Sequence, residues 1–175
     1  MATPHEEHRR LGPRQVNFAI ITVSTSRHRL QTEGKPYTDE SGDLASSIIK
    51  GAGHNVALRL VVGDDESMIR RALDSLIHRP DVDVIVTIGG TGLAKTDVTI
   101  EAVRSILEKE IEGFGELFRY VSYSRVGAGA ILSRATAGIA NGKLIIALPG
   151  SPDGVRTGLE LIMGEIPHIL YVARG

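Results

Sequence analysis

The residue types best suited to chemistry follow a short apolar segment near the middle of the chain. Residues Val82–Ile88 are mostly β-branched, and Gly89-Gly90-Thr91-Gly92 comes directly after them. Such a run is typical of a buried strand in a parallel sheet. Glycines at its end let backbone N–H groups approach an anion closely. Asp97 follows five residues later, so the segment predicts a nucleotide-like substrate with Mg²⁺ as a candidate ion. A tight turn followed by a helix cap is the alternative.

A second acidic group follows another strand pattern. The predicted strand Asn55–Val62 ends in Gly63-Asp64-Asp65. Ligands of open α/β sheets bind outside the carboxyl ends of the strands, so we expect Asp64 and Asp97 to face one crevice. There they could share a metal or divide acid–base work. The alternative is that these acids only complement the dipole of the helix that follows. The sequence leaves open whether Asp64 or Asp65 is the functional acid.

One well-known phosphate-binding motif is nearly matched but disfavoured. Residues 89–96 resemble the P-loop pattern G-x-x-x-x-G-K-[ST], but Ala94 stands where the second glycine belongs. The backbone must curl around phosphate at that position, so alanine is a serious defect. The later apolar strand Leu144–Leu148 also ends without the aspartate that would hold Mg²⁺ in such proteins.

Two further segments place small polar residues where a ligand could bind. The first predicted strand, residues 16–23, ends in Ser24-Thr25-Ser26-Arg27. These residues could bind phosphate or form a serine turn. After a predicted loop over residues 28–38, Asp39 and Ser41 begin a helix. They could form an anion pocket or serve only as the helix cap.

The remaining pattern predicts a mixed, mostly parallel sheet. Asn141-Gly142 is a strong hairpin signal and predicts one antiparallel strand over residues 135–140, before the strand that ends at Leu148. Thr99 is predicted to cap another helix. A helix is also predicted from Gly113 to about Tyr123, where its aromatic residues suit packing or a subunit contact.

Length and composition limit the class of protein. The 175 residues suit a single domain, expected over residues 15–175 behind a mobile polar tail at residues 1–14. The net charge of −1 gives no global attraction to nucleic acid or membrane. No apolar run approaches the roughly 20 residues of a membrane span. No cysteine is present, which excludes disulfides and thiolate chemistry and fits a cytoplasmic protein.

Four segments, taken together in order and spacing, resemble the MoaB/MogA family of molybdenum-cofactor biosynthesis proteins and the similar gephyrin G domain. They are TIGGTGLAKTDVT, EGFGELFR, ILSRATAGI and LIIALPGSP, within a match over about residues 16–170. The resemblance implies a single three-layer α/β/α domain and a homo-oligomer, either a trimer or a hexamer. It implies transfer of AMP from Mg-ATP to the phosphate of molybdopterin, with release of pyrophosphate. The final metal could be molybdenum or tungsten. A non-catalytic molybdopterin-binding or carrier protein is the alternative.

The resemblance also implies roles for individual residues. Asp64 and Asp97 match the two functional aspartates, as catalytic residues and metal ligands. Thr25 departs from the family pattern, since many relatives have an acid or amide there, and this weakens a metal role at that point. Arg27 and Lys95 are further local cations. The implied substrate-binding and nucleotide-binding residues are Ser24, Ser26, Asp39, Ser41, Gly42, Gly89, Gly90, Thr91, Gly92, Arg134, Pro149, Gly150 and Ser151.

Overall fold

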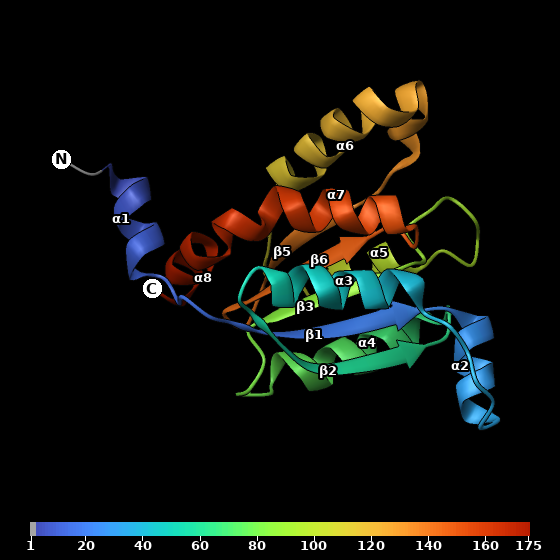
Figure 1. Cartoon of the computed structure of the whole chain (residues 1–175). Coiled ribbons are helices and arrows are strands. Elements are labelled where there is room, and N and C mark those ends of the chain that lie inside the picture. The colour runs from blue at the N-terminus through green and yellow to red at the C-terminus, as the bar shows by residue number, and fades with distance from the viewer. Residues whose placement is uncertain (1–2) are drawn as a thin grey trace.

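The structure, a computed structural model, describes residues 3–175 and is built on one mixed β-sheet (Figure 1). The strands of the described residues are β1 Asn17–Val23, β2 Asn55–Val62, β3 Val84–Ile88, β4 Lys109–Glu110, β5 Thr136–Ala140 and β6 Lys143–Leu148. Their order across the sheet is β2-β1-β3-β6-β5-β4. Strands β2, β1, β3 and β6 are parallel, whereas β5 is antiparallel to both of its neighbours.

Helices cover both faces of this sheet and make a three-layer α/β/α domain (Figure 1). Helices α3, α6, α7 and α8 contribute to the apolar cluster on one face, and α4 and α5 to the cluster on the other. Among the described residues, no helix is both long enough and apolar enough to cross a membrane. The helices are α1 Pro4–Leu11, α2 Thr25–Thr32, α3 Glu40–Gly51, α4 Glu66–Ile77, α5 Thr99–Arg104, α6 Glu112–Val126, α7 Pro152–Ile162 and α8 Ile166–Arg174, with 3₁₀ turns η1 Gly127–Leu132 and η2 Met163–Glu165.

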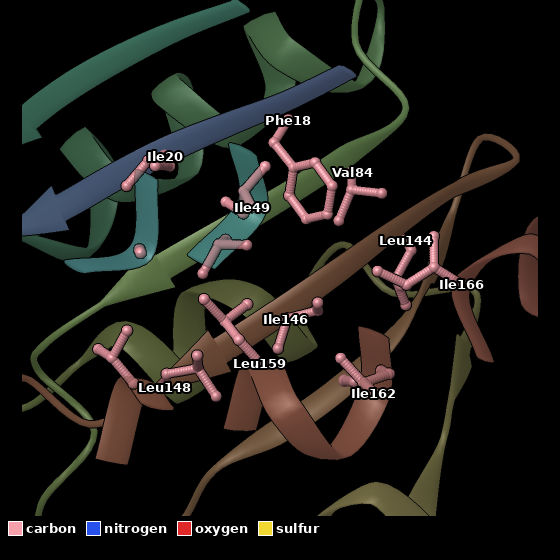
Figure 2. Close-up of a cluster of buried hydrophobic side chains, with 14 of the residues drawn as sticks. Phe18, Ile20, Ile49, Val84, Leu144, Ile146, Leu148, Leu159, Ile162 and Ile166 are labelled. Atoms are coloured by element: carbon pink, nitrogen blue, oxygen red, sulfur yellow. The ribbon is translucent and has the colours of Figure 1, made fainter. Parts of the chain in front are cut away.

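The side-chain period of the strands divides the core into two clusters. In β1, Phe18 and Ile20 belong to the cluster under α3 and α7, whereas Ala19 and Ile21 belong to the cluster under α4. Figure 2 shows the first cluster, where Ile49 of α3 and Leu159 of α7 lie against side chains of β1, β3 and β6. Strands that are apolar on both faces must be covered on both faces, and this fixes the three layers.

The predicted mixed sheet is confirmed, and so is its hairpin. Asn141 and Gly142 have φ angles of 49° and 67°, the left-handed pair that a two-residue hairpin turn requires. Strand β4 was not predicted because both of its residues are charged and exposed. It pairs antiparallel with β5 at the sheet edge.

Helix α2 corrects the predicted loop over residues 28–38. The helix occupies Thr25–Thr32, and the Ser24 hydroxyl accepts a hydrogen bond from the N–H of Arg27 as its N-cap. None of its residues is buried, so the sequence has no apolar stripe from which this helix could be predicted. In Figure 1 it stands beyond the arrowheads of β1 and β2.

The N-terminal segment also differs from the expected polar tail. Residues 4–11 form α1, which begins with a capping box between Thr3 and Glu6. The ring of His8 lies 5.4 Å from that of His168 and 5.0 Å from that of Tyr171, so α1 packs on α8. Arg9 forms an ion pair with Glu165 in the same contact. Residues 1–2 of the expected tail lie outside the described residues, and the domain boundary at residue 15 stays a prediction.

Candidate active site

A cleft of about 520 Å³ opens at the carboxyl ends of the parallel strands. It is bounded by Val23 at the end of β1, by the segment that follows β3, and by Pro149 and Gly150 after β6. This is the edge at which open α/β sheets bind ligands. Its lining residues are Val23, Ser24, Arg27, Asp64, Gly89, Gly90, Thr91, Gly92, Asp97, Leu132, Ser133, Pro149 and Gly150.

The glycine loop, residues 89–92, cannot carry side chains at its glycine positions without moving its neighbours. Gly89 and Gly90 have φ angles of 104° and 65°, in the region that favours glycine. A Cβ on Gly89 would lie 2.5 Å from the carbonyl oxygen of Val23. A Cβ on Gly90 would overlap the hydroxyl of Thr99. The loop therefore stays tight against β1 and the start of α5, with its backbone on the cleft surface.

Three N–H groups of the loop, at residues 90–92, are unpaired within the described part of the chain, whereas the N–H of Gly89 donates to the carbonyl of Leu148 at 3.0 Å. Among the described residues, the N–H groups of Gly90, Thr91 and Gly92 have no hydrogen-bond acceptor, and all three residues line the cleft. The carbonyl oxygen of Gly90 accepts from the N–H of Thr99 at 3.0 Å. Unpaired N–H groups on a cleft surface are suited to binding an anion.

Asp97 lies half-buried beside this loop. Its Oδ2 accepts a hydrogen bond from the N–H of Ala94 at 2.9 Å, and its own N–H donates to the carbonyl of Ala94 at 2.9 Å. This closed turn fixes the carboxylate over Gly92, where a Cβ would lie 2.6 Å from Oδ2. No described residue donates to Oδ1, so one oxygen is available to a ligand.

Asp64 is held in a similar way on the other side of the cleft. Its Oδ2 accepts from the N–H of Thr25 at 2.9 Å and from the hydroxyl of Thr25 at 2.7 Å. The N–H of Asp64 donates back to the Thr25 hydroxyl at 3.0 Å. Thr25 is the first residue of α2, so the carboxylate also benefits from the helix N-terminus. As in Asp97, no described residue donates to the second oxygen.

The neighbouring acid, Asp65, has a different position. It is the N-cap of α4, and its Oδ1 accepts from the N–H of Met68 at 2.7 Å and from the hydroxyl of Ser67 at 2.8 Å. These hydrogen bonds, led by that of Met68, lower the pKa of Asp65. Asp64 lines the cleft and Asp65 does not, which favours Asp64, and its role as the functional acid stays a prediction.

Three residues predicted at the start of α3 have internal partners. Asp39 is buried, and its carboxylate accepts from the hydroxyl of Thr22 at 2.7 Å, from the N–H of Gly42 at 3.1 Å and from Arg59 at 2.9 Å. Burial opposes the ionised form, but these bonds outweigh it and lower the pKa of Asp39. Ser41 donates to the carbonyl of Gly150 at 2.7 Å. None of these residues lines the cleft, so they shape its wall from behind.

The other predicted binding residues divide between the cleft and its supports. Ser24 and Arg27 line the cleft, and Ser26 lies next to Ser24 with the hydroxyl oxygens 3.2 Å apart. Ser151 is instead the N-cap of α7 and accepts from the N–H of Gly154. Lys95 is exposed and is not among the lining residues. Arg134 lies behind the glycine loop, where it donates to loop carbonyls.

Some features of the site were missed from the sequence. Leu132 and Ser133 line the cleft, although their 3₁₀ turn has no phosphate-binding pattern. The sequence predicts no contact between Thr25 and Asp64, yet Thr25 holds that carboxylate. Thr99 was predicted as a helix cap, and this is wrong. It is the first residue of α5 and makes no cap bond, while its buried hydroxyl has no partner among the described residues.

Comparisons with known proteins agree with this architecture. The family model described as "Probable molybdopterin binding domain" matches residues 19–168. A molybdenum cofactor biosynthesis protein B of Bacillus anthracis is 45% identical over 167 residues, which cover 94% of this chain and 95% of that protein. A protein of Pyrococcus furiosus named molybdopterin adenylyltransferase is 40% identical over 173 residues, which cover 97% of this chain and 98% of that protein.

A solved structure gives the same result for the fold. The crystal structure of a tungsten cofactor synthesizing protein MoaB from Pyrococcus furiosus has a TM-score of 0.82 and 38% sequence identity to this chain. The match covers 93% of this chain and 99% of that chain. With the family model and near full-length relatives in agreement, this chain belongs to the molybdopterin-binding domain family of MoaB and MogA proteins.

Proposed function

We propose that this protein is a molybdopterin adenylyltransferase, which transfers AMP from Mg-ATP to the phosphate of molybdopterin and releases pyrophosphate. The observation that supports this most is that Asp64 and Asp97 line the same cleft as the glycine loop. The name of the 40%-identical Pyrococcus furiosus relative gives the same activity. Both molybdenum and tungsten cofactors are named among the relatives, so either pathway suits the chain.

In this reaction an oxygen of the pterin phosphate attacks the α-phosphorus of ATP. A new P–O bond forms while the bond to the pyrophosphate oxygen breaks. A phosphate nucleophile is already ionised near neutral pH, so no general base is needed. The task of the protein is to bring two polyanions together and align them, by positioning and charge neutralisation. The free N–H groups of Gly90, Thr91 and Gly92 would bind phosphate oxygens, and Arg27 supplies a cation on the cleft wall.

The two carboxylates fit a magnesium ion that arrives with the triphosphate. Within the described residues, no group of three or more His, Cys, Asp or Glu could form a protein-only metal site. Mg²⁺ in nucleotide sites is held by one or two carboxylates together with phosphate oxygens and water. The oxygens of Asp97 and Asp64 that lack donors would serve as those ligands. The ion would neutralise charge on the triphosphate.

An assay of pyrophosphate release tests this function. Purified protein is incubated with ATP, MgCl₂ and molybdopterin, and pyrophosphate and adenylylated molybdopterin are both measured. We expect equal amounts of the two products, strict dependence on molybdopterin, and loss of turnover in Asp97→Ala with an unchanged circular dichroism spectrum. Tight molybdopterin binding without pyrophosphate release would instead support a non-catalytic carrier, the second candidate.

Two further expectations from the family belong with this proposal. We infer a homo-oligomer, either a trimer or a hexamer, and a cytoplasmic location. Leu117, Tyr120 and Tyr123 of α6 are large apolar or aromatic side chains with exposed fractions of 54%, 77% and 62%, as expected of a surface that a second copy covers. Light scattering on the purified protein measures the number of subunits directly, and a monomer would contradict the assembly.

A further inference from the structure

The position of Arg134 indicates a role other than contact with the substrate. Arg134 lies between η1 and β5, and its side chain reaches the back of the glycine loop. Its Nε donates to the carbonyl oxygens of Thr91 and Gly92 at 3.3 Å and 3.0 Å. Its Nη2 donates to the carbonyl oxygen of Asp97 at 3.1 Å. One guanidinium thus holds three carbonyl groups of the segment that carries both the phosphate-binding amides and the candidate catalytic acid.

In residues 90–92, though not in Gly89, the carbonyl oxygens are hydrogen-bonded while the N–H groups have no partner in the described structure. The carbonyl oxygens of Gly90, Thr91, Gly92 and Asp97 all have donors, from Thr99 or Arg134. The N–H groups of Gly90, Thr91 and Gly92 have no acceptor among the described residues, and these three residues line the cleft. A carbonyl oxygen turned toward the cleft would repel a phosphate, and an N–H turned there attracts it.

The charge of Arg134 is neutralised locally, which argues against a direct electrostatic role. Its Nη1 forms an ion pair with Glu101 of α5, and this hydrogen bond lowers the pKa of Glu101. Arg134 is not among the residues that line the cleft. The planar guanidinium can satisfy several acceptors in fixed directions, which an ammonium group on a flexible stem cannot do.

We propose that Arg134 is a positioning residue that fixes the polarity of the glycine loop: it holds the loop carbonyls away from the cleft and so leaves the N–H groups free to bind phosphate. This proposal rests on the proposed function, because the phosphate that the loop would bind is that of ATP or molybdopterin. The loop geometry itself is independent of that function and can be tested without any substrate.

The first test is hydrogen exchange of the ligand-free protein. In Arg134→Gln and Arg134→Lys we expect the hydrogen-bonded backbone amides of Ala94 and Asp97 to exchange at least about tenfold faster, with β3 and β6 unchanged. The matched control is Arg104→Gln, which removes an arginine at the end of α5 whose partner is Glu110 and which makes no hydrogen bond to described residues of the loop. It should leave exchange in the loop unchanged.

The second test measures Mg-ATP binding by calorimetry in Glu101→Gln, where the two explanations predict opposite changes in affinity. This variant keeps the guanidinium but removes its anchor and its neutralising charge. If Arg134 attracts the substrate directly, the added net positive charge tightens Mg-ATP binding. If Arg134 positions the loop, the loosened guanidinium weakens binding, by about threefold to tenfold for the loss of one charge-assisted hydrogen bond. The weaker binding should accompany faster exchange of the hydrogen-bonded amides of Ala94 and Asp97.

Two results would overturn the proposal. One is unchanged loop exchange in Arg134→Gln together with weaker Mg-ATP binding, since this would make Arg134 a direct ligand. The other is tighter binding in Glu101→Gln. If Arg134→Gln does not fold, Glu101→Gln and Arg134→Lys decide the matter by the same two measurements. Failure of the proposed adenylyl transfer would appear as absent pyrophosphate release in the wild type, with these exchange differences still present.

Discussion

Similar residues lie at the amino-terminal ends of the parallel strands (the amino edge) and at their carboxyl-terminal ends (the carboxyl edge), but their hydrogen bonding differs. At the amino edge, Asp83 precedes β3, and both of its oxygens have donors: Oδ2 from the N–H of Asn17 at 2.8 Å and Oδ1 from Arg174 at 2.6 Å. At the carboxyl edge, Asp97 has one oxygen held by Ala94 and the other without a described donor. The carboxylate of Asp83, with both oxygens bonded, links β1 and α8, whereas Asp97 is fixed by one oxygen and leaves the other without a described donor beside the cleft.

The cations differ in the same way. At the amino edge, the ammonium of Lys143 is buried and donates to the carbonyls of Arg79 and Val82. Burial lowers the pKa of Lys143. At the carboxyl edge, Arg27 keeps part of its guanidinium on the cleft while Nε donates to the carbonyl of Thr38. The comparison teaches that incomplete hydrogen bonding, more than residue type, marks the functional edge.

The largest expected effect follows from removal of the free carboxylate at the cleft. Asp97→Ala should reduce AMP transfer by about 100-fold to 1,000-fold, the usual scale for loss of a group that stabilises transition-state charge. The matched control is Asp83→Ala at the opposite edge, which should lower the melting temperature but keep the turnover per folded molecule. Equal loss of turnover in both variants would remove the distinction between the two edges.

A smaller loss is expected on the other side of the cleft. Asp64→Asn should reduce AMP transfer by about 10-fold to 100-fold, because one ligand or orienting oxygen is lost while Thr25 still holds the side chain. Asp65→Asn keeps a good N-cap for α4 and should have near wild-type turnover. The two rates measured side by side decide which acid acts, and the reverse ranking would refute the assignment of Asp64.

Lys143→Met tests the amino edge by stability rather than turnover. The substitution leaves the carbonyl of Val82 without a described donor and removes one of the two donors to the carbonyl of Arg79, so the free energy of unfolding should fall by about 1–3 kcal/mol. Urea denaturation measures this loss. Turnover per folded molecule should stay the same, and a strong drop in turnover would show that this edge also serves the reaction.

The smallest effect concerns Asp39, which lies behind the cleft wall. Its folded-state pKa is below the ordinary value of 3.8, so its contribution to stability is present at neutral pH and is lost as pH falls below about 4. Asp39→Asn should lower the free energy of unfolding by about 1 kcal/mol at pH 7, since Arg59 is partly exposed and screened. The difference from the wild type should shrink as the pH falls below about 4.

Most of the fold could be predicted from the sequence because its signals are local. The apolar runs of β1, β3 and β6 and the Asn141-Gly142 turn each specify their own structure. Helix α2 could not be predicted, since it buries no side chain and has no apolar period. Strand β4 could not be predicted either, because Lys109 and Glu110 owe their strand conformation to pairing with β5.

Part of the cleft lining could be predicted from the sequence, but the hydrogen-bond partners of the candidate site residues could not. The glycine loop, Asp64 and Asp97 were named from their places after strands, and the cleft brings them together. The roles of Asp39 and Arg134 depend on partners far along the chain, such as Arg59 and the carbonyl of Gly92. A motif identifies a residue type at a position, but it carries no information on which atoms already have hydrogen-bond partners.

A crystal structure with a non-hydrolysable ATP analogue and Mg²⁺ tests the central claim most directly. The account predicts a phosphate group within hydrogen-bond distance of the N–H groups of Gly90, Thr91 or Gly92, and a Mg²⁺ ion between phosphate oxygens and the free oxygen of Asp97. Nucleotide bound elsewhere, or a loop whose carbonyl oxygens face the cleft, would contradict it.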